Sequence, residues 1–521
     1  MRTLRELIDR NARYFPRRLA YVHADRRVTH GEYAARAQRL GSSLYRLGLR
    51  RQDRFAVLAM NCLEYYECYA AAEASGFLMV PVNFRLAPPE IEYVLRDAGA
   101  RLLVFEAQYA QAIEKLRPQL AQVENYVCIA VDAQGRRTSF ETPSWAVDFE
   151  ELMRDGDEAG APYLPRPEDY AYLWYTSGTT GKPKGVAWRQ ESLATTARMT
   201  AHVSELTGAS RYLQTSPAFH IGGKGYVLGA SFDGGATVIH RGFDPVAALE
   251  TIQRERITHT FMVAAMVQAL LAVPDVARYD LASLEQVFSA SAPIPVPVLR
   301  RAIELLGPVF SIQYGCTEIA SICVLPRHEV NPSGSEQDLR RLGSVGHPVG
   351  EISLRLVDED GRDVPAGKPG EVAVQSPCML DGYWNNAPAS LEAIRDGWYH
   401  TGDIGVQDED GYLYLIDRKK DMIISGGENI YSREVEEALA SHADVADCAV
   451  IGVPDPKWVE AVKALVVLRG GARPDAAALI AHCKTRIASY KCPKSIDFVA
   501  ELPRLPTGKV DKPALRSRYR N

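Results

Sequence analysis

The segment 175–185 constrains this chain more than any other, because its residues indicate a loop that binds a polyphosphate. Hydroxyl side chains, glycines and two lysines alternate in the order Tyr175-Thr176-Ser177-Gly178-Thr179-Thr180-Gly181-Lys182-Pro183-Lys184-Gly185. The hydroxyls and lysines suit phosphate oxygens, and the glycines let backbone amides come close to them. The apolar, aromatic run at residues 169–174 predicts a buried strand that delivers the loop.

The loop is not of the Walker type. That motif needs a glycine, four residues, then Gly-Lys followed by Ser or Thr. Here Thr176 stands five positions before Gly181, and Pro183 follows Lys182. An ordinary P-loop motor or switch is therefore disfavoured. A flexible Gly/Ser/Thr linker is the other alternative, but linkers seldom carry two lysines at fixed spacing behind an aromatic strand.

Further motifs follow the loop in order, and the whole set resembles the adenylate-forming (AMP-binding) enzyme superfamily, in its acyl-CoA synthetase branch. They are Tyr314-Gly315-Cys316-Thr317-Glu318, Trp398-Tyr399-His400-Thr401-Gly402-Asp403, Asp417-Arg418-Lys419-Lys420-Asp421 with Gly426-Gly427-Glu428-Asn429-Ile430, and Leu505-Pro506-Thr507-Gly508-Lys509. The resemblance spans essentially the whole chain. It implies that a carboxylic acid and ATP give acyl-AMP and pyrophosphate, after which coenzyme A gives acyl-CoA and AMP.

The resemblance also implies roles for individual residues. Lys509 bridges the attacking carboxylate and the α-phosphate, where both reactants are anionic and positive charge is needed. His220 lies near the reacting carboxylate, and Glu318 with Thr176 holds Mg²⁺ between phosphates. The expected nucleotide and coenzyme A contacts are Thr176, Ser177, Gly178, Thr179, Thr180, Gly181, Lys182, Lys184, Ser289, Ala290, Ser291, Gln313, Tyr314, Gly315, Cys316, Thr317, Asp403, Arg418, Gly426, Gly427 and Glu428.

Taken alone, each of these residues has a plainer explanation. A single lysine near the end of a chain is usually solvated surface, and a Thr-Glu pair more often begins a helix. An Asp after Gly, as at Asp403, is most often a turn residue. The string 418–421 has the composition of a solvated charge run. Only their joint occurrence favours the catalytic interpretation.

The sequence predicts an α/β fold in two parts. Strand and helix patterns alternate through the first half, which indicates a large N-terminal domain of stacked βαβ-type subdomains. Short strands after Gly343 indicate a small β-barrel layer, and a small mobile α+β domain follows. We expect domains at residues 1–417 and 421–521, joined by a hinge at 418–420 in which Lys420 is the pivot. Rotation there would exchange Lys509 for the 426–429 segment between the two half-reactions.

Composition sets outer limits on partners and compartment. The net charge of −5 argues against nucleic acid as a bulk electrostatic partner. Nine cysteines without a Cys-x-x-Cys pair favour a reducing, cytoplasmic environment. Residues 1–10 have the pattern of an amphipathic helix, and no run approaches the length of a transmembrane span. Peripheral membrane contact and the oligomeric state, a homodimer included, stay open.

The acid itself is not determined by the sequence. His220 stands where adenylation domains for amino acids usually have Asp, so a fatty, aryl or steroid-type acid is expected. The small residues Gly222, Gly223, Gly225, Gly229 and Ala230 indicate either a wide acyl pocket or close helix packing. A luciferase-like oxygenase and a non-catalytic adenylate-binding protein are the alternatives. Ser291, Ser432 and Val459 depart from the family pattern, which commonly has Gly, Pro and Gly there.

Overall fold

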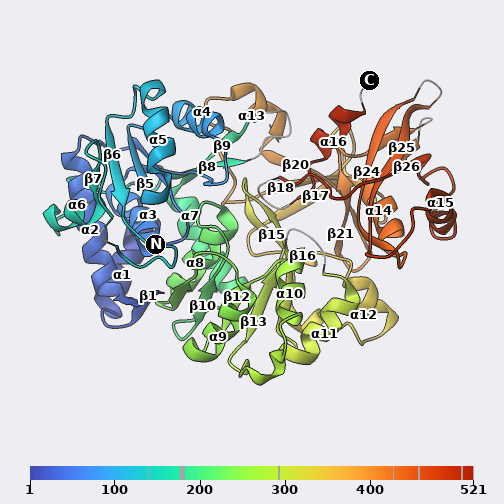
Figure 1. Cartoon of the computed structure of the whole chain (residues 1–521), viewed down its shortest axis with the longest axis horizontal. Helices are drawn as coiled ribbons and strands as arrows, with labels where there is room; N and C mark the ends of the chain where they lie inside the picture. Colours follow the sequence, from blue (N-terminus) through green and yellow to red (C-terminus); the bar gives the residue numbers. More distant parts are fainter. Residues whose placement is uncertain are drawn as a thin grey trace. The chain divides into compact units, whose positions relative to one another are not determined.

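The computed structural model describes the chain except residues 139, 177–181, 291–293, 426–427, 456–457, 506–508 and 520–521, and only the backbone of residues 428 and 429 (Figure 1). Two compact units emerge from the contacts. One comprises Met1–Ser353 with Gln375–Tyr399, and the other comprises Leu354–Val374 with His400–Asn521. These contacts do not bear on the predicted domain movement about Lys420, which stays a prediction.

A seven-stranded sheet forms part of the first unit, in the order β7-β6-β5-β3-β4-β8-β9. Its strands are β3 (Arg54–Leu58), β4 (Leu78–Pro81), β5 (Leu102–Glu106), β6 (Asn125–Ile129), β7 (Val147–Asp148), β8 (Tyr170–Thr176) and β9 (Lys184–Arg189). Neighbouring strands are parallel except β8 and β9, which form an antiparallel hairpin. The predicted βαβ organisation and the strand before the phosphate loop are thereby confirmed.

A nine-stranded sheet completes the strand framework of this unit, in the order β16-β15-β14-β13-β12-β10-β11-β1-β2. Its strands are β1 (Leu19–His23), β2 (Arg26–Thr29), β10 (Arg211–Gln214), β11 (Ala236–Ile239), β12 (His259–Phe261), β13 (Gln286–Ser289), β14 (Phe310–Cys316), β15 (Ala320–Leu325) and β16 (His347–Pro348). The strands from β1 to β14 along this order are parallel, while β2, β15 and β16 add antiparallel edges.

Helices cover both sheets (Figure 1). They are α1 (Leu4–Tyr14), α2 (His30–Arg46), α3 (Leu63–Ser75), α4 (Pro88–Ala98), α5 (Ala110–Leu116), α6 (Phe149–Asp155), α7 (Gln190–Val203), α8 (Ile221–Phe232), α9 (Pro245–Glu255), α10 (Ala264–Leu271), α11 (Val296–Leu306), α12 (Glu336–Arg341) and α13 (Ala387–Ala393). Helix α4 begins at Pro88, since proline is well tolerated in the first helical turn.

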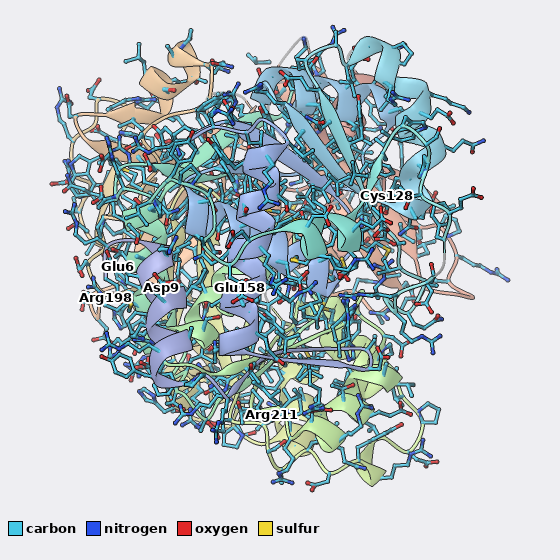
Figure 2. The ribbon with its side chains drawn as sticks, turned by 90° about the vertical axis from the view of Figure 1, so that its left-hand side faces the viewer. Glu6, Asp9, Cys128, Glu158, Arg198 and Arg211 are labelled. Atoms are coloured by element: carbon cyan, nitrogen blue, oxygen red, sulfur yellow. The ribbon has the colours of Figure 1, made fainter. Side chains whose placement is uncertain are left out.

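Helix α1 confirms the amphipathic pattern at the N-terminus. Leu4, Leu7 and Ile8 are buried, whereas Glu6 and Asp9 are exposed, and both acidic residues are labelled on this helix in Figure 2. The apolar positions recur at helical spacing, so one face packs inward while the other meets water. Thr3 caps the helix by accepting a hydrogen bond from the backbone N–H of Glu6.

Helix α3 is buried along its whole length, because it packs against strands of both sheets. It nevertheless carries three glutamates. Each has a cationic partner: Glu64 pairs with Arg26, Glu67 with Arg36, and Glu73 with Lys224. A buried carboxylate is tolerated only when it is paired, so these ion pairs are part of the core of the first unit.

Short strands come next in the chain. The predicted β-barrel layer corresponds to a sheet in which β17 (Ser353–Val357), β18 (Gly370–Gln375), β20 (Trp398–Gln407) and β21 (Leu413–Arg418) are neighbours, while β19 (Ile394–Arg395) pairs with the first residues of β20. The α+β region that follows contains β22 (Ile423–Ser425), β23 (Glu428–Ile430), β24 (Val445–Asp455), β25 (Val459–Leu468), β26 (Ser495–Phe498), α14 (Ser432–Ala440), α15 (Ala476–Lys484) and α16 (Lys512–Arg518).

This α+β region has a core of its own. Ile423, Val435, Leu439 and Val450 belong to one cluster of buried side chains, with Leu479 of α15 packed into it. Such a core supports the prediction of a separate C-terminal α+β domain.

The chain carries nine cysteines, and none of them forms a disulfide. In the portion of the chain that the structure describes, no helix has both the length and the apolar character that a membrane crossing requires.

Candidate active site

The β8–β9 hairpin holds the predicted phosphate loop. Thr176 at the end of β8 pairs with Lys184 at the start of β9, and the Thr176 hydroxyl donates to the Lys184 carbonyl at 3.4 Å. The predicted contacts Ser177, Gly178, Thr179, Thr180 and Gly181 lie between them, outside the described residues. The hairpin therefore fixes both ends of the loop.

Both lysines of the loop lie over aromatic rings. The Lys182 ammonium is 5.2 Å from the centre of the Tyr93 ring, and the Lys184 ammonium is 4.8 Å from the centre of the Tyr383 ring. The Tyr93 hydroxyl also donates to the carbonyl of Pro183 at 3.2 Å. Ring faces attract cations, so these contacts orient two positive charges beside the loop.

The Tyr-Gly-Cys-Thr-Glu motif lies at the end of β14, next to the hairpin. Trp188 of β9 donates its indole N–H to the carbonyl of Thr317 at 2.9 Å. Glu318 is only 8 % exposed, and its Oε1 accepts a hydrogen bond of 2.9 Å from the hydroxyl of Tyr383. The structure thus brings Thr176, Lys184 and Glu318 into one region, as the sequence motifs predict.

Tyr383 is a site residue that the sequence analysis missed. Its ring lies under Lys184 and its hydroxyl bonds Glu318, so it joins two predicted motifs. Its backbone forms a β-bridge with Val186, and burial, followed by the charge of Glu318, raises the pKa of its phenol. The residue stands in an unremarkable loop sequence, so only the three-dimensional packing reveals it.

The predicted adenine wall follows β13. Ser289 ends this strand and pairs with Ile312 of β14, the residue before Gln313, while Ala290 follows it and Ser291 lies outside the described residues. The Ser289 hydroxyl is buried without a hydrogen-bond partner among the described residues. Tyr314, the predicted stacking partner of adenine, is buried in β14.

His220 caps helix α8. Its Nδ1 accepts a hydrogen bond of 3.1 Å from the backbone N–H of Gly222, which satisfies one of the free amides at the helix start. Because Nδ1 is the acceptor, the neutral ring carries its proton on Nε2. His220 is exposed.

The glycines after His220 serve helix packing at two positions. A Cβ at Gly223 would lie 2.2 Å from the carbonyl oxygen of Pro217, and one at Gly229 would lie 2.8 Å from the Thr200 side chain of α7. Gly225 has open space around it instead. Close packing is therefore the reason for Gly223 and Gly229.

Tyr226 on α8 is a second residue that the sequence analysis missed. Its ring stacks on Phe288 with centres 4.7 Å apart and planes 6° apart, and lies 5.5 Å from Phe261. Its hydroxyl donates to Oε1 of Gln313 at 2.6 Å. Helix α8, which His220 caps, is thereby joined to the strand that carries Tyr314.

Asp403 and Arg418 form an ion pair in the second unit. They are directly opposite each other in β20 and β21, and Nε of Arg418 lies 2.6 Å from Oδ1 of Asp403. The expectation that Asp403 lies in a turn-like segment is wrong, since it lies inside β20, where Gly402 takes a left-handed conformation with φ +70°. The pairing supports a joint role at the ribose.

The predicted hinge follows β21 directly. Lys420 is exposed, and the pKa of its ammonium is lowered by partial desolvation and by the charges of Arg418, Arg516 and Lys509, while Asp421 acts in the opposite direction. Lys509 itself is exposed. Gly426 and Gly427 lie outside the described residues, as does the side chain of Glu428.

The departures at Ser432 and Val459 have different structural consequences. Ser432 is the first residue of α14, a position that also accepts proline, and its hydroxyl donates to Asp417 at 2.9 Å. Val459 is 72 % exposed and has φ +71°, a left-handed conformation that β-branched residues strongly disfavour. The first substitution is accommodated, whereas the second is strained.

Comparison with known proteins agrees with this geometry. The model of the AMP-binding enzyme family matches residues 8–384, and the model of the AMP-binding enzyme C-terminal domain matches residues 434–509. A feruloyl-CoA synthase from Amycolatopsis is 37 % identical over 513 residues, covering 98 % of both chains. An indoleacetate–CoA ligase from Aromatoleum aromaticum is 37 % identical over 515 residues, covering 98 % of this chain and 97 % of the other.

Among solved structures, an anthranilate CoA ligase in complex with anthranoyl-AMP matches with a TM-score of 0.86 and 29 % identity, covering 99 % of this chain and 97 % of the other. The chain belongs to the AMP-binding enzyme family. It is an acid–thiol ligase of the acyl-CoA synthetase type that uses ATP and coenzyme A, which confirms the prediction from the sequence motifs.

Proposed function

We propose that this enzyme activates an aromatic carboxylic acid, by way of its aryl-AMP, to the coenzyme A thioester. The observation that carries this choice is the aromatic stack of Tyr226, Phe288 and Phe261 beside Gln313 and Tyr314. Flat aromatic walls pack well against an aromatic ring. The relatives named for ferulate, indoleacetate and anthranilate support the same choice.

In the first half-reaction, the acid's carboxylate attacks the α-phosphorus of ATP and pyrophosphate leaves. His220 contacts the carboxylate and holds it in place, while Lys182 and Lys184 bind the leaving phosphates. Lys509 neutralises the charge that develops between carboxylate and α-phosphate. Asp403 accepts hydrogen bonds from the ribose hydroxyls, and Arg418 orients that carboxylate.

Glu318 is the residue that would hold Mg²⁺, with Thr176 beside it. A buried carboxylate oriented by the Tyr383 hydroxyl fits a hard cation that binds few protein oxygens and keeps phosphate oxygens and waters as its other ligands. When bound, the ion would offset negative charge on the phosphate oxygens.

In the second half-reaction, the C-terminal domain turns about Lys420 and withdraws Lys509. The 426–429 segment then lines the path by which the thiol of coenzyme A reaches the acyl-adenylate. The thiol sulfur bonds the carbonyl carbon, its proton is lost, and AMP leaves. A cytoplasmic location suits the nine free cysteines.

Pyrophosphate release tests the proposal. The enzyme is incubated with MgATP and a panel of aryl, medium- to long-chain fatty and steroid-type acids, with and without coenzyme A. We expect pyrophosphate with aryl acids, and thioester and AMP only when coenzyme A is present. Preference for an alkyl or steroid acid by a factor of ten in kcat/KM would contradict the aryl assignment.

A further inference from the structure

We propose that the side-chain amide of Gln313 selects acids whose aromatic ring carries an oxygen substituent, a hydroxyl or an ether. This inference rests on the proposed function, because it assigns a recognition role inside the same acyl-binding region. It adds a positive requirement for polarity to a pocket whose other described walls are aromatic.

Gln313 lies where three parts of the proposed site meet. It precedes Tyr314 in β14, its strand is paired with the end of β13 at Ser289, and its side chain bonds Tyr226 of the helix that His220 caps. Its contact with Tyr226 directs the Gln313 side chain towards the helix that follows the carboxylate-binding histidine.

The amide of Gln313 has only half of its hydrogen-bonding capacity used. Its Oε1 accepts from Tyr226 at 2.6 Å, and this contact directs the amide. Its Nε2 is buried, in a side chain only 6 % exposed, and has no hydrogen-bond partner among the described residues. A buried amide N–H without an acceptor is costly, so an acceptor supplied by the substrate is favoured there.

A second polar group lies on the other side of the same tyrosine. The ring of Tyr212 contacts that of Tyr226 with centres 5.9 Å apart, and its buried hydroxyl likewise has no partner among the described residues. Two unsatisfied polar groups therefore lie near Tyr226, whose ring also contacts those of Phe261 and Phe288. Such isolated polar groups in an apolar site are typical of specificity determinants.

Another glutamine in the same sheet provides a contrast. Gln286, at the start of β13, is also buried, but its Nε2 donates to the hydroxyl of Ser311 at 3.1 Å. The N–H of that amide is therefore satisfied within the protein, while its Oε1 has no partner among the described residues. Gln286 is therefore a matched control for replacing a buried glutamine in this sheet without touching the proposed contact.

The test first uses the wild-type enzyme and size-matched acids. Cinnamic and phenylacetic acids with a hydroxyl or methoxy group at ring position 3 or 4 are compared with those bearing methyl or ethyl there. We expect the better oxygenated acid of each pair to have kcat/KM roughly 10- to 100-fold higher, the range for one buried hydrogen bond. Equal values for oxygenated and alkyl-substituted acids would overturn the inference.

The variants then locate the effect. Gln313→Met should bring the ratio of kcat/KM for oxygenated acids to kcat/KM for alkyl-substituted acids close to one, mainly by lowering kcat/KM for the oxygenated acids. Gln286→Met should leave this ratio as in the wild type. Tyr226→Phe retains the ring stack but frees Gln313, and should lower the ratio partway. A Gln313→Met enzyme with the wild-type ratio would refute the role of Gln313, and if that variant does not fold, Tyr226→Phe decides.

Failure of this inference is distinguishable from failure of the proposed function. If aryl acids of every substituent release pyrophosphate equally well, the aryl assignment stands and the amide contact is refuted. If only alkyl or steroid acids react, both are refuted together.

Discussion

The hydroxyl of Tyr383 donates to Glu318 at 2.9 Å, which ties the predicted metal-binding carboxylate to a residue whose ring lies under Lys184. The same aromatic side chain therefore contacts the cationic group proposed to bind phosphates and the anionic group proposed to hold Mg²⁺. Its position suggests that it keeps the two at a working separation before ATP arrives.

Replacing Tyr383 by Phe tests this positioning. The ring contact with Lys184 remains while Glu318 loses its donor, so we expect adenylation to slow by roughly tenfold, the effect of one hydrogen bond to a charged group. The apparent KM for MgATP should rise, and pyrophosphate release titrated with Mg²⁺ measures both. Tyr93→Phe is the matched control, because Tyr93 lies over Lys182 without contacting Glu318. Equal effects of the two variants would remove the special role of Tyr383.

Lys509→Ala should separate the half-reactions. Loss of a positioned charge that acts only in adenylation predicts a fall of roughly 10²- to 10³-fold in pyrophosphate release. A preformed acyl-adenylate supplied with coenzyme A should still become the thioester at close to the wild-type rate. Rapid-quench assays of each step measure this. Equal damage to both steps would show that the two half-reactions share Lys509.

Val459→Gly should stabilise the protein. A left-handed conformation costs an L-residue roughly 1–2 kcal/mol, while glycine loses roughly 0.5–1 kcal/mol through its flexible unfolded state. At φ +71° the cost of the left-handed conformation is larger than the cost of glycine's flexibility, so we expect a gain of about 1 kcal/mol in the free energy of unfolding. Val459→Ala keeps a Cβ and should gain less. Thermal unfolding of the three proteins measures the order.

Much of the fold could be predicted from local patterns. The helix at Pro88–Ala98 and the strand at Arg54–Leu58 follow from a proline start and from a short apolar run, both of which are local signals. Asp403 was misplaced because Gly-Asp usually marks a turn, whereas here the cross-strand pair with Arg418 keeps the glycine inside a strand.

The site was predictable only where motifs carry it. Glu318 and Lys184 stand in recognisable segments, but Tyr383 and Tyr226 act through partners 65 and 87 positions away in the sequence. No local pattern encodes such contacts. Likewise, the packing role of Gly223 depends on the carbonyl of Pro217, which periodicity alone does not reveal.

Buried histidines predict acid sensitivity. Burial lowers the pKa of His259 from 6.5 to about 4, and that of His240 also to about 4. Between pH 6.5 and pH 4 these histidines bind protons in the unfolded chain but not in the folded chain. Their contribution to stability is therefore fully present above pH 6.5 and is lost as the pH falls towards 4. Each histidine contributes up to about 1.4 kcal/mol per pH unit.

The matched variant for this dependence is His259→Gln, which cannot take up the proton. Its Tm is expected to be lower than wild type at pH 7, since packing changes, but to fall less steeply between pH 6.5 and 4. Differential scanning calorimetry across that range measures the slope. Parallel slopes for wild type and variant would exclude His259 as a source of the acid sensitivity.

Removing one charge of the buried Glu73–Lys224 ion pair should cost far more stability than removing both charges. Nζ of Lys224 lies 2.7 Å from Oε1 of Glu73, both side chains are nearly inaccessible to water, and the hydroxyl of Tyr172 bonds the same carboxylate. Glu73→Gln leaves the ammonium without a counter-charge, although the ring of Tyr69 lies 4.6 Å from it. We expect a loss of roughly 3–5 kcal/mol, seen as a lower Tm.

Removing both charges should recover most of that loss. In the double variant Glu73→Gln with Lys224→Met, no unpaired charge is left in the core, and the side-chain volumes are nearly conserved. The double-mutant cycle then gives the coupling free energy between the two residues, for which we expect roughly 2 kcal/mol or more. If the loss of stability in the double variant equals the sum of the losses in Glu73→Gln and Lys224→Met, the two residues are not coupled. Burial of each group, rather than their pairing, would then determine the stability of α3 between the two sheets.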